Sequence, residues 1–287
     1  MRPFERASAY GRMIRFSHSV FALPFALTSA ALAAREGGAT GGHVFWIVVA
    51  MVAARSAAMG FNRLVDQEID ARNPRTAKRE LPTGAVSRGE AWLFVALSVT
   101  VFVLAAWMLN PLCLALSPVA LAIVLGYSYT KRFTAASHAV LGLALAVAPV
   151  GAWLAIRGRF DVVPLVLGLA VLLWVAGFDT LYACQDVEFD RHEGLRSLPA
   201  RLGVPGALWA ARAMHVGTVL LLVAIFGLAP LHPVYLLGVA GVAVILAWEH
   251  SLVRPQDLSR VMQAFNLNGW VSLGYFAVTA AAAWLRQ

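Results

Sequence analysis

Two short stretches of the chain carry aspartates at intervals of four residues. In the first acidic cluster, Asp66 and Asp70 follow Asn62. The second acidic cluster is the pair Asp186 and Asp190. A spacing of four places each set on one face of a helix, where like charges repel unless a cation lies among them. Carboxylate and amide oxygens favour Mg²⁺, which often binds a few carboxylates together with substrate phosphates. We therefore expect these five residues to hold Mg²⁺ with a diphosphate.

Basic residues flank both acidic clusters. They are Arg63, Arg72, Arg75 and Arg79 near the first cluster, and Arg191, Arg196 and Arg201 near the second. Guanidinium groups match phosphate oxygens well, and charge develops on a diphosphate as it departs. Acids and bases that simply pair in solvated loops would explain any one of these residues. The repetition of the whole arrangement favours a diphosphate site.

The two connections that carry the clusters form an internal repeat. In each, the aspartate pair is followed by Arg-x-Leu-Pro, and a tryptophan comes ten residues after the proline. The copies end at Trp92 and Trp209. Such a repeat indicates two halves that each contribute one cluster to a shared site.

The elements that must position these residues are membrane helices. The chain is 60% hydrophobic and 13% charged, with a mean hydropathy of +0.72, which is far outside the range of soluble domains. Apolar runs of about 20 residues recur along the chain, and a run of that length crosses a bilayer only as a helix. We expect an all-α integral membrane protein with nine spans, at residues 17–34, 43–63, 91–109, 112–130, 138–156, 162–182, 207–227, 232–250 and 264–284.

Basic residues gather in the connections on one side of these spans. By the positive-inside rule, the N-terminus and both motif loops, residues 63–90 and 183–206, are expected in the cytoplasm. An even number of spans separates the loops, so both should lie on the same side. We expect one membrane domain over residues 1–287 in the cytoplasmic membrane. The charge of +8 then reflects topology, and no nucleic acid is expected as a partner.

The motifs resemble those of the UbiA prenyltransferase superfamily over most of the chain. Asn62-x3-Asp66-x3-Asp70 and Tyr182-x3-Asp186-x3-Asp190 are similar to its two aspartate-rich motifs. Further similar residues are Tyr127, Lys131, Arg132 and Thr134 in YSYTKRFT, and Asp179-Thr180. The resemblance implies a ring of nine helices around a central cavity, capped by the two motif loops, in which Mg²⁺ holds a polyprenyl diphosphate.

The run NRLVDQEIDARNPRTAKRELP resembles the 4-hydroxybenzoate polyprenyltransferase branch, and particularly members of the futalosine route to menaquinone. Its Asn62-Arg63 start departs from the commoner Asn-Asp or Asp-Gly. The resemblance implies transfer of the prenyl group to 4-hydroxybenzoate or to 1,4-dihydroxy-6-naphthoate; haem or lipid acceptors are the alternative within the superfamily. We expect the diphosphate to bind Asn62, Arg63, Arg75, Arg79, Lys131, Arg132 and Arg196.

The implied reaction ionises the allylic C–O bond, after which a ring carbon beside the phenol oxygen attacks and a base removes the ring proton. Asp66, Asp70, Asp186 and Asp190 are expected to be catalytic. Asp179 lies about two helical turns before Asp186. It is a further candidate, with the second acidic cluster, for the base or for orienting the phenol.

Arg55 is isolated within an apolar run, where a guanidinium is costly and by default functional. It lies seven residues before Asn62, on the same helix face. We expect Arg55, with Tyr182, to bind the aromatic acid through its carboxylate; a salt bridge to a buried acid is the alternative. The histidines show no mutual metal-ligand spacing, and we interpret His138 and most others as interfacial or hydrogen-bonded.

Two other classes of membrane protein share some of these features. A secondary transporter would also show repeats and many spans, but its site lies near the midplane on broken helices, whereas the acids here lie at one surface. A lipid-headgroup phosphotransferase would also use Mg²⁺, but its Asp-Gly-x2-Ala-Arg run is missing.

Overall fold

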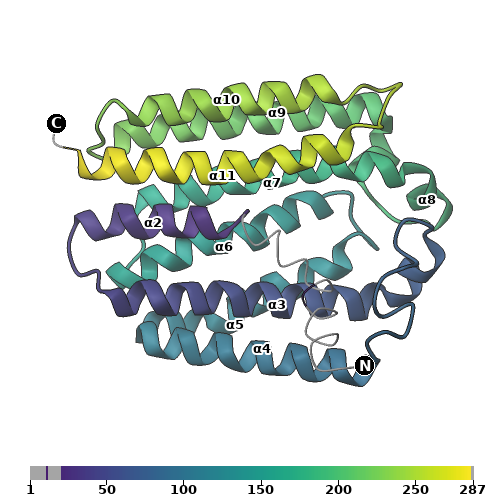
Figure 1. Cartoon of the computed structure of the whole chain (residues 1–287), viewed down its shortest axis with the longest axis horizontal. Helices are drawn as coiled ribbons and strands as arrows, with labels where there is room; N and C mark the ends of the chain where they lie inside the picture. The colour runs from purple at the N-terminus through teal and green to yellow at the C-terminus, as the bar shows by residue number, and fades with distance from the viewer. Residues whose placement is uncertain (1–10, 12–20, 286–287) are drawn as a thin grey trace.

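The computed structural model describes residue 11 and residues 21–285 (Figure 1). These residues form helices and no named strand. The long helices are α2 (Leu23–Arg35), α3 (Gly41–Arg72), α4 (Arg88–Leu109), α5 (Pro111–Thr130), α6 (Ser137–Arg157), α7 (Val162–Ala183), α9 (Leu198–Leu228), α10 (Tyr235–Leu252) and α11 (Val261–Trp284). The short helices η2 (Cys184–Asp186) and α8 (Val187–His192) separate α7 from α9.

Seven of the described helices are long and apolar enough to cross a membrane: α3 to α7, α9 and α10. Helix α2 is shorter, at 13 residues, and the first part of its expected span, 17–34, lies outside the described residues, as do the N-terminal arginines up to Arg15. Helix α11 has 24 residues but is not among the seven. Nine crossings and a closed ring therefore stay predictions.

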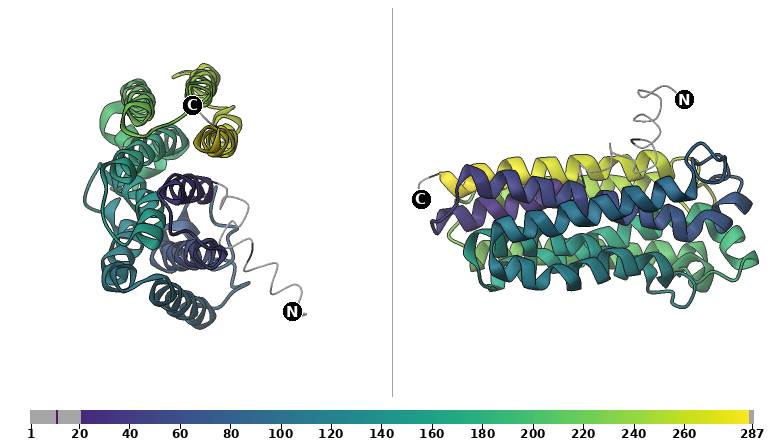
Figure 2. Two further views of the ribbon diagram at one scale, coloured as in Figure 1. Left: turned by 90° about the vertical axis from the view of Figure 1, so that its left-hand side faces the viewer. Right: turned by 90° about the horizontal axis from the view of Figure 1, so that it is seen from below.

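The helices run side by side along the length of the molecule (Figure 2). Helix α7 lies between α6 and α9 and supplies much of the core, with Leu167, Val171 and Trp174 fully buried. Helices α6 and α7 approach closely at Gly142, where an added Cβ would lie 2.3 Å from the carbonyl oxygen of Leu172. Small residues permit this backbone approach, which replaces the hydrophobic effect as the source of helix association in lipid.

The two motif loops lie at the same end of the molecule, as predicted from the even number of runs between them (Figure 1). Helix α3 continues past its apolar run to Arg72, so Asn62, Asp66 and Asp70 share one helix. The second copy differs from the first. Helix α7 ends at Ala183, Asp186 closes the 3₁₀ turn η2, and Asp190 lies in α8. Our interpretation of Asp186 and Asp190 as one continuous helix end was wrong.

The internal repeat is visible in how the next helix begins. In the first copy, Ser87 caps α4 with its side chain accepting from the amide of Glu90. In the second, Ser197 caps α9, and the helix then bends at Gly203, whose φ of 70° favours glycine. Gly203 lies six residues before Trp209 in the sequence, and Ser87 lies five residues before Trp92. The second copy therefore adds one helical turn to the loop.

A buried polar chain ties α11 to the rest of the second half. The indole nitrogen of Trp174 in α7 donates to Asn268 in α11 (2.6 Å), and the Asn268 amide donates to Glu249 in α10 (3.0 Å). All three side chains are fully buried. Hydrogen bonds of this kind satisfy polar groups that lipid cannot.

Candidate active site

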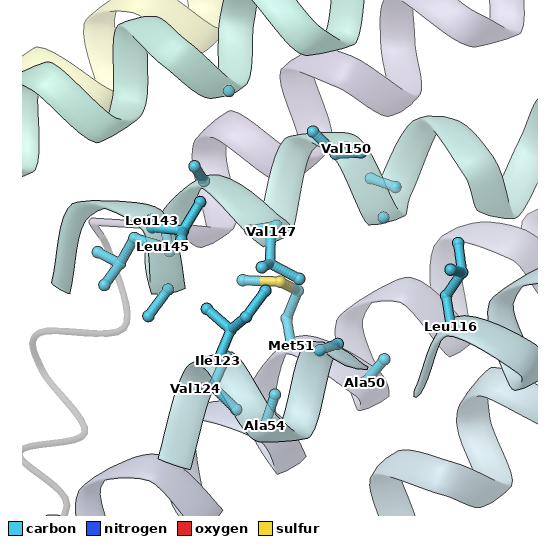
Figure 3. A pocket seen from close by; sticks show the side chains of 18 of the residues that line it. Ala50, Met51, Ala54, Leu116, Ile123, Val124, Leu143, Leu145, Val147 and Val150 are labelled. Carbon is cyan, nitrogen blue, oxygen red and sulfur yellow. The ribbon is translucent and has the colours of Figure 1, made fainter. Parts of the chain in front are cut away.

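Two cavities meet inside the bundle. The polar cavity, of about 310 Å³, lies at the end that carries both acidic clusters and is lined by residues of both. The apolar cavity, of about 540 Å³, is lined mainly by α3, α5 and α6. Figure 3 shows Met51, Ile123 and Val147 pointing into it from these three helices. Five residues line both cavities: Arg55, Met59, Tyr127, Leu141 and Leu145. A polar head and an apolar tail could therefore occupy one continuous space.

Asp66 is buried and surrounded by cationic and amide donors. The Lys131 ammonium lies 2.6 Å from one of its oxygens and the Arg132 guanidinium 2.9 Å from the other. The Asn62 amide donates to the first oxygen at 3.0 Å. Lys131 and Arg132 follow the end of α5, so this contact joins the motif of α3 to the YSYTKRFT segment. The chain's own cations thus balance the charge of Asp66.

Asp70 is held in the same way from within its own loop. Arg79 donates to both carboxylate oxygens, at 2.7 and 2.8 Å. Arg63, about two helical turns earlier on α3, lies 3.9 Å from Asp70 and is itself buried. The Arg79 side chain returns over the end of α3 because the turn after Asn73 reverses the chain, with the Asn73 side chain accepting from the amide of Arg75.

Asp186, in the second acidic cluster, is bound by side chains of the first motif loop. Arg75 donates to both of its oxygens, one at 2.9 Å, and also to the hydroxyl of Tyr182 at 2.9 Å. The Asn73 amide donates to Asp186 at 3.1 Å. Burial is the largest single effect and lowers the pKa of Arg75. The hydrogen bond to Asp186, together with the negative charges of Tyr182, Asp186 and Asp70, outweighs burial and raises that pKa above its ordinary value. These contacts confirm that the two acidic clusters lie side by side at one cavity; their shared function stays a prediction.

Asp190 has a neutral partner. The Ser197 hydroxyl donates to it at 2.7 Å while also capping α9. Beside it, Arg196 is turned toward the loop between α5 and α6, where its backbone amide donates to Lys131 (2.7 Å) and its guanidinium to the carbonyl of Phe133 (2.9 Å). Arg196 does not line either cavity. The structure therefore gives Arg196 the position of a loop brace, and its binding of diphosphate stays a prediction.

Asp179 lies deeper in α7 and lines the polar cavity. One of its oxygens is 2.7 Å from Nδ1 of His138, the second residue of α6. His138 is buried and hydrogen-bonded, which is one of the two interpretations that the sequence allowed, but the sequence did not identify Asp179 as its partner. An isolated histidine 41 residues from its partner carries no signal in the sequence. Asn73 and Ser197, which hold Asp186 and Asp190, were also missed, although both directly flank the motifs.

Arg55 lines both cavities at the point where they meet, about two helical turns from Asn62 along α3. This is the location that the helical spacing predicts. Tyr182 lines the polar cavity and packs its ring against Phe265. The predicted acceptor residues and the predicted diphosphate residues, apart from Arg132 and Arg196, therefore line one cavity.

The residues present fit a hard divalent cation by their chemistry. Every carboxylate of the two clusters lines the polar cavity, and Asn62 adds an amide oxygen, which is the oxygen donor set that Mg²⁺ prefers. Among the described residues, no three His, Cys, Asp or Glu side chains are gathered closely enough to form a metal site as they stand. The positive charge beside Asp66, Asp70 and Asp186 comes instead from Lys131, Arg132, Arg79 and Arg75.

Comparison with known proteins agrees with this arrangement. The model of the UbiA prenyltransferase family matches residues 22–281. A 4-hydroxybenzoate octaprenyltransferase of Methylococcus capsulatus is 32% identical over 95% of this chain and 94% of its own length. One from Methylobacillus flagellatus is 33% identical over 88% of this chain and 86% of its own.

Solved structures show the same fold. The apo structure of a UbiA homolog from Aeropyrum pernix K1 has a TM-score of 0.84 and 37% identity, covering 91% of this chain and 96% of that one. A UbiA homolog from Archaeoglobus fulgidus, bound to GPP and Mg²⁺, has a TM-score of 0.73 and 22% identity, covering 95% and 99%. With paired acidic motifs, a polar cavity that opens into an apolar one, and a family match over nearly its whole length, this chain belongs to the UbiA prenyltransferase family.

Proposed function

We propose that the chain transfers a polyprenyl group from a polyprenyl diphosphate to an aromatic acid of the 4-hydroxybenzoate or 1,4-dihydroxy-6-naphthoate type, in quinone biosynthesis. The observation that carries this proposal is the continuity of the two cavities through Arg55, Tyr127 and Leu145. A diphosphate fits the cationic polar cavity, and its prenyl chain fits the apolar cavity. The donor thus matches the site in both of its parts.

Asn62, Asp66, Asp70, Asp186 and Asp190 are the residues that would hold Mg²⁺. When bound, Mg²⁺ supplies positive charge that stabilises the departing diphosphate. Arg63, Arg75 and Arg79 line the same cavity and add hydrogen-bond donors to the phosphate oxygens. The Archaeoglobus fulgidus homolog, with GPP and Mg²⁺ bound, supports this pairing of ligands.

The chain's residues then serve two halves of the reaction. Arginine and lysine donors at the polar cavity favour cleavage of the allylic C–O bond, because the negative charge that develops on the leaving oxygen is met by fixed donors. The allylic cation is attacked by the ring carbon beside the acceptor's phenol oxygen. Asp179 receives the ring proton, since it lines the cavity yet lies deeper than the two acidic clusters.

Arg55 binds and orients the acceptor through its carboxylate. Both candidate acids carry a carboxylate, and a guanidinium can bind a carboxylate through two parallel hydrogen bonds. Arg55 stands where the polar and apolar cavities meet, which places a bound ring beside the reacting end of the donor. The relatives from Methylobacillus flagellatus and Methylococcus capsulatus are both named 4-hydroxybenzoate octaprenyltransferase, and this favours the benzoate.

The test is product detection by mass spectrometry, with purified protein in detergent, Mg²⁺, geranyl diphosphate and either acid. Prenylation of one acid identifies the acceptor. Mg²⁺-dependent release of diphosphate without either product would retain the donor and overturn the aromatic acceptor. Folded protein that does neither would overturn the proposal and favour a transporter. Cysteine labelling from each side of the membrane would test the cytoplasmic location of the motif loops.

A further inference from the structure

His138 lies in the polar cavity, between Asp179 and the second motif loop. It is the second residue of α6, is buried, and lines the polar cavity beside Asp179. Its Nδ1 is 2.7 Å from one Asp179 oxygen. Its Nε2 accepts from the backbone amide of Leu198 at 3.3 Å. Both ring nitrogens are therefore engaged, each by a group of a different element.

These two hydrogen bonds determine the tautomer of the His138 imidazole. A backbone N–H only donates, so the Nε2 that faces Leu198 must be the acceptor nitrogen of a neutral imidazole. The proton then lies on Nδ1, which donates to Asp179. The carboxylate is thus held by one oxygen. The Asp179 side chain remains 26% exposed, and it lines the polar cavity.

The backbone amide that fixes His138 belongs to the second motif loop. Leu198 follows Ser197, whose hydroxyl donates to Asp190. The carbonyl of Arg196, one residue earlier, accepts from the hydroxyl of Ser137 at 3.4 Å. The start of α6 is therefore fastened to the same few residues that hold an acid of the diphosphate site. Asp179, His138, Leu198, Ser197 and Asp190 form one connected chain of contacts.

We propose that His138 is a positioning residue for the acceptor step, which fixes the orientation of the Asp179 carboxylate and ties it to the folded state of the second motif loop. The inference rests on the proposed function, because it assigns His138 to the step in which Asp179 receives the ring proton. His138 exchanges no proton itself. Its Nδ1 proton stays on the ring while the other oxygen of Asp179 takes the proton from the acceptor.

The test compares His138→Leu with His138→Gln in the full chain. Leucine makes neither hydrogen bond, whereas the amide of glutamine can donate to Asp179 and accept from Leu198. We expect His138→Leu to lower kcat for the aromatic acid about 10- to 100-fold, the range seen when an orienting hydrogen-bond partner is removed. The KM for geranyl diphosphate should not change, and His138→Gln should recover most of kcat. His192→Leu, an exposed histidine near the same loop, is the matched control and should behave as wild type.

A double-mutant cycle separates positioning from general damage to the fold. In an Asp179→Asn background, His138→Leu should cost nothing further, because residues that act as one unit are not additive. Equal losses in the Leu and Gln variants, or fully additive losses with Asp179→Asn, would overturn the positioning role while the wild-type enzyme still makes product. A wild-type enzyme that prenylates neither acid would overturn the proposed function, and this inference with it.

Discussion

Mg²⁺ should bind this protein weakly until a diphosphate is present. In the absence of ligands, the carboxylates that would hold the metal are already engaged by cations of the chain: Asp66 by Lys131 and Arg132, Asp70 by Arg79, and Asp186 by Arg75. A metal ion must displace these cations. A bound diphosphate provides anionic oxygens to which the displaced lysine and arginine side chains can bind in place of the carboxylates. Metal and donor should therefore bind cooperatively.

The size of this coupling follows from the pairs that are exchanged. A hydrogen bond to a charged group contributes about 1.5–3 kcal/mol. Lys131, Arg132 and Arg75 are each about 30% exposed, so solvent screening reduces each contribution toward about 1 kcal/mol. Release of two to three such contacts costs about 2–3 kcal/mol, which is about 30- to 140-fold in affinity. Coupling of this size is common between linked sites.

Titration calorimetry in detergent measures the coupling without turnover. Mg²⁺ would be titrated into protein with and without a non-cleavable geranyl thiodiphosphate. Lys131→Met should strengthen Mg²⁺ binding in the absence of the analogue, because Asp66 loses a competing cation, and should reduce the gain that the analogue gives. Lys78, the other lysine of the chain, is exposed in the first motif loop, and Lys78→Met is the matched control. Equal Mg²⁺ affinities with and without the analogue would refute the reasoning.

Further predictions concern the acceptor, the prenyl chain, the metal and the packing. Arg55→Ala should raise the KM for the aromatic acid about 10- to 100-fold, since a charge-assisted contact of about 1.5–3 kcal/mol is lost, with the donor KM unchanged; an unaltered acceptor KM would contradict this role. Gly151 lines the apolar cavity with open space at its Cβ position, so Gly151→Phe should lower turnover of long prenyl diphosphates more than of geranyl diphosphate, whereas Gly227→Phe, with similar space outside the cavity, should not. EDTA should abolish product formation and added Mg²⁺ should restore it. Gly142→Ala should destabilise the protein by about 1–3 kcal/mol through overpacking against Leu172, visible as a lower Tm in detergent.

The sequence alone predicted those parts of the site that are encoded by short-range spacing. Asn62, Asp66 and Asp70 share one helix because a spacing of four is a helical period. Arg55 lines the cavity for the same reason. The meeting of the two clusters followed from the even number of apolar runs between them, and the contact of Arg75 with Asp186 bears this out.

Features that depend on tertiary contacts could not be predicted. The contact of His138 with Asp179 joins the start of α6 to the end of α7, and no sequence pattern predicts it. Arg196 carries the sequence signature of a diphosphate ligand, but the loop directs its guanidinium to the carbonyl of Phe133. The end of α7 at Ala183 agrees with the predicted span 162–182. The 3₁₀ turn that separates α7 from α8 was missed, because the residues from Cys184 to His192 are helical in character.

The buried chain from Trp174 through Asn268 to Glu249 bears on how the protein enters the membrane. Helix α11 carries Gln263, Asn266 and Asn268 and is not among the seven helices with the apolar character of a span. Inserted alone, it would expose those amides to lipid at a cost of several kcal/mol. Its partners Trp174 and Glu249 are supplied by helices synthesised earlier. We therefore expect the insertion of α11, as a predicted span, to depend on prior assembly of α7 and α10, which supply its buried hydrogen-bond partners.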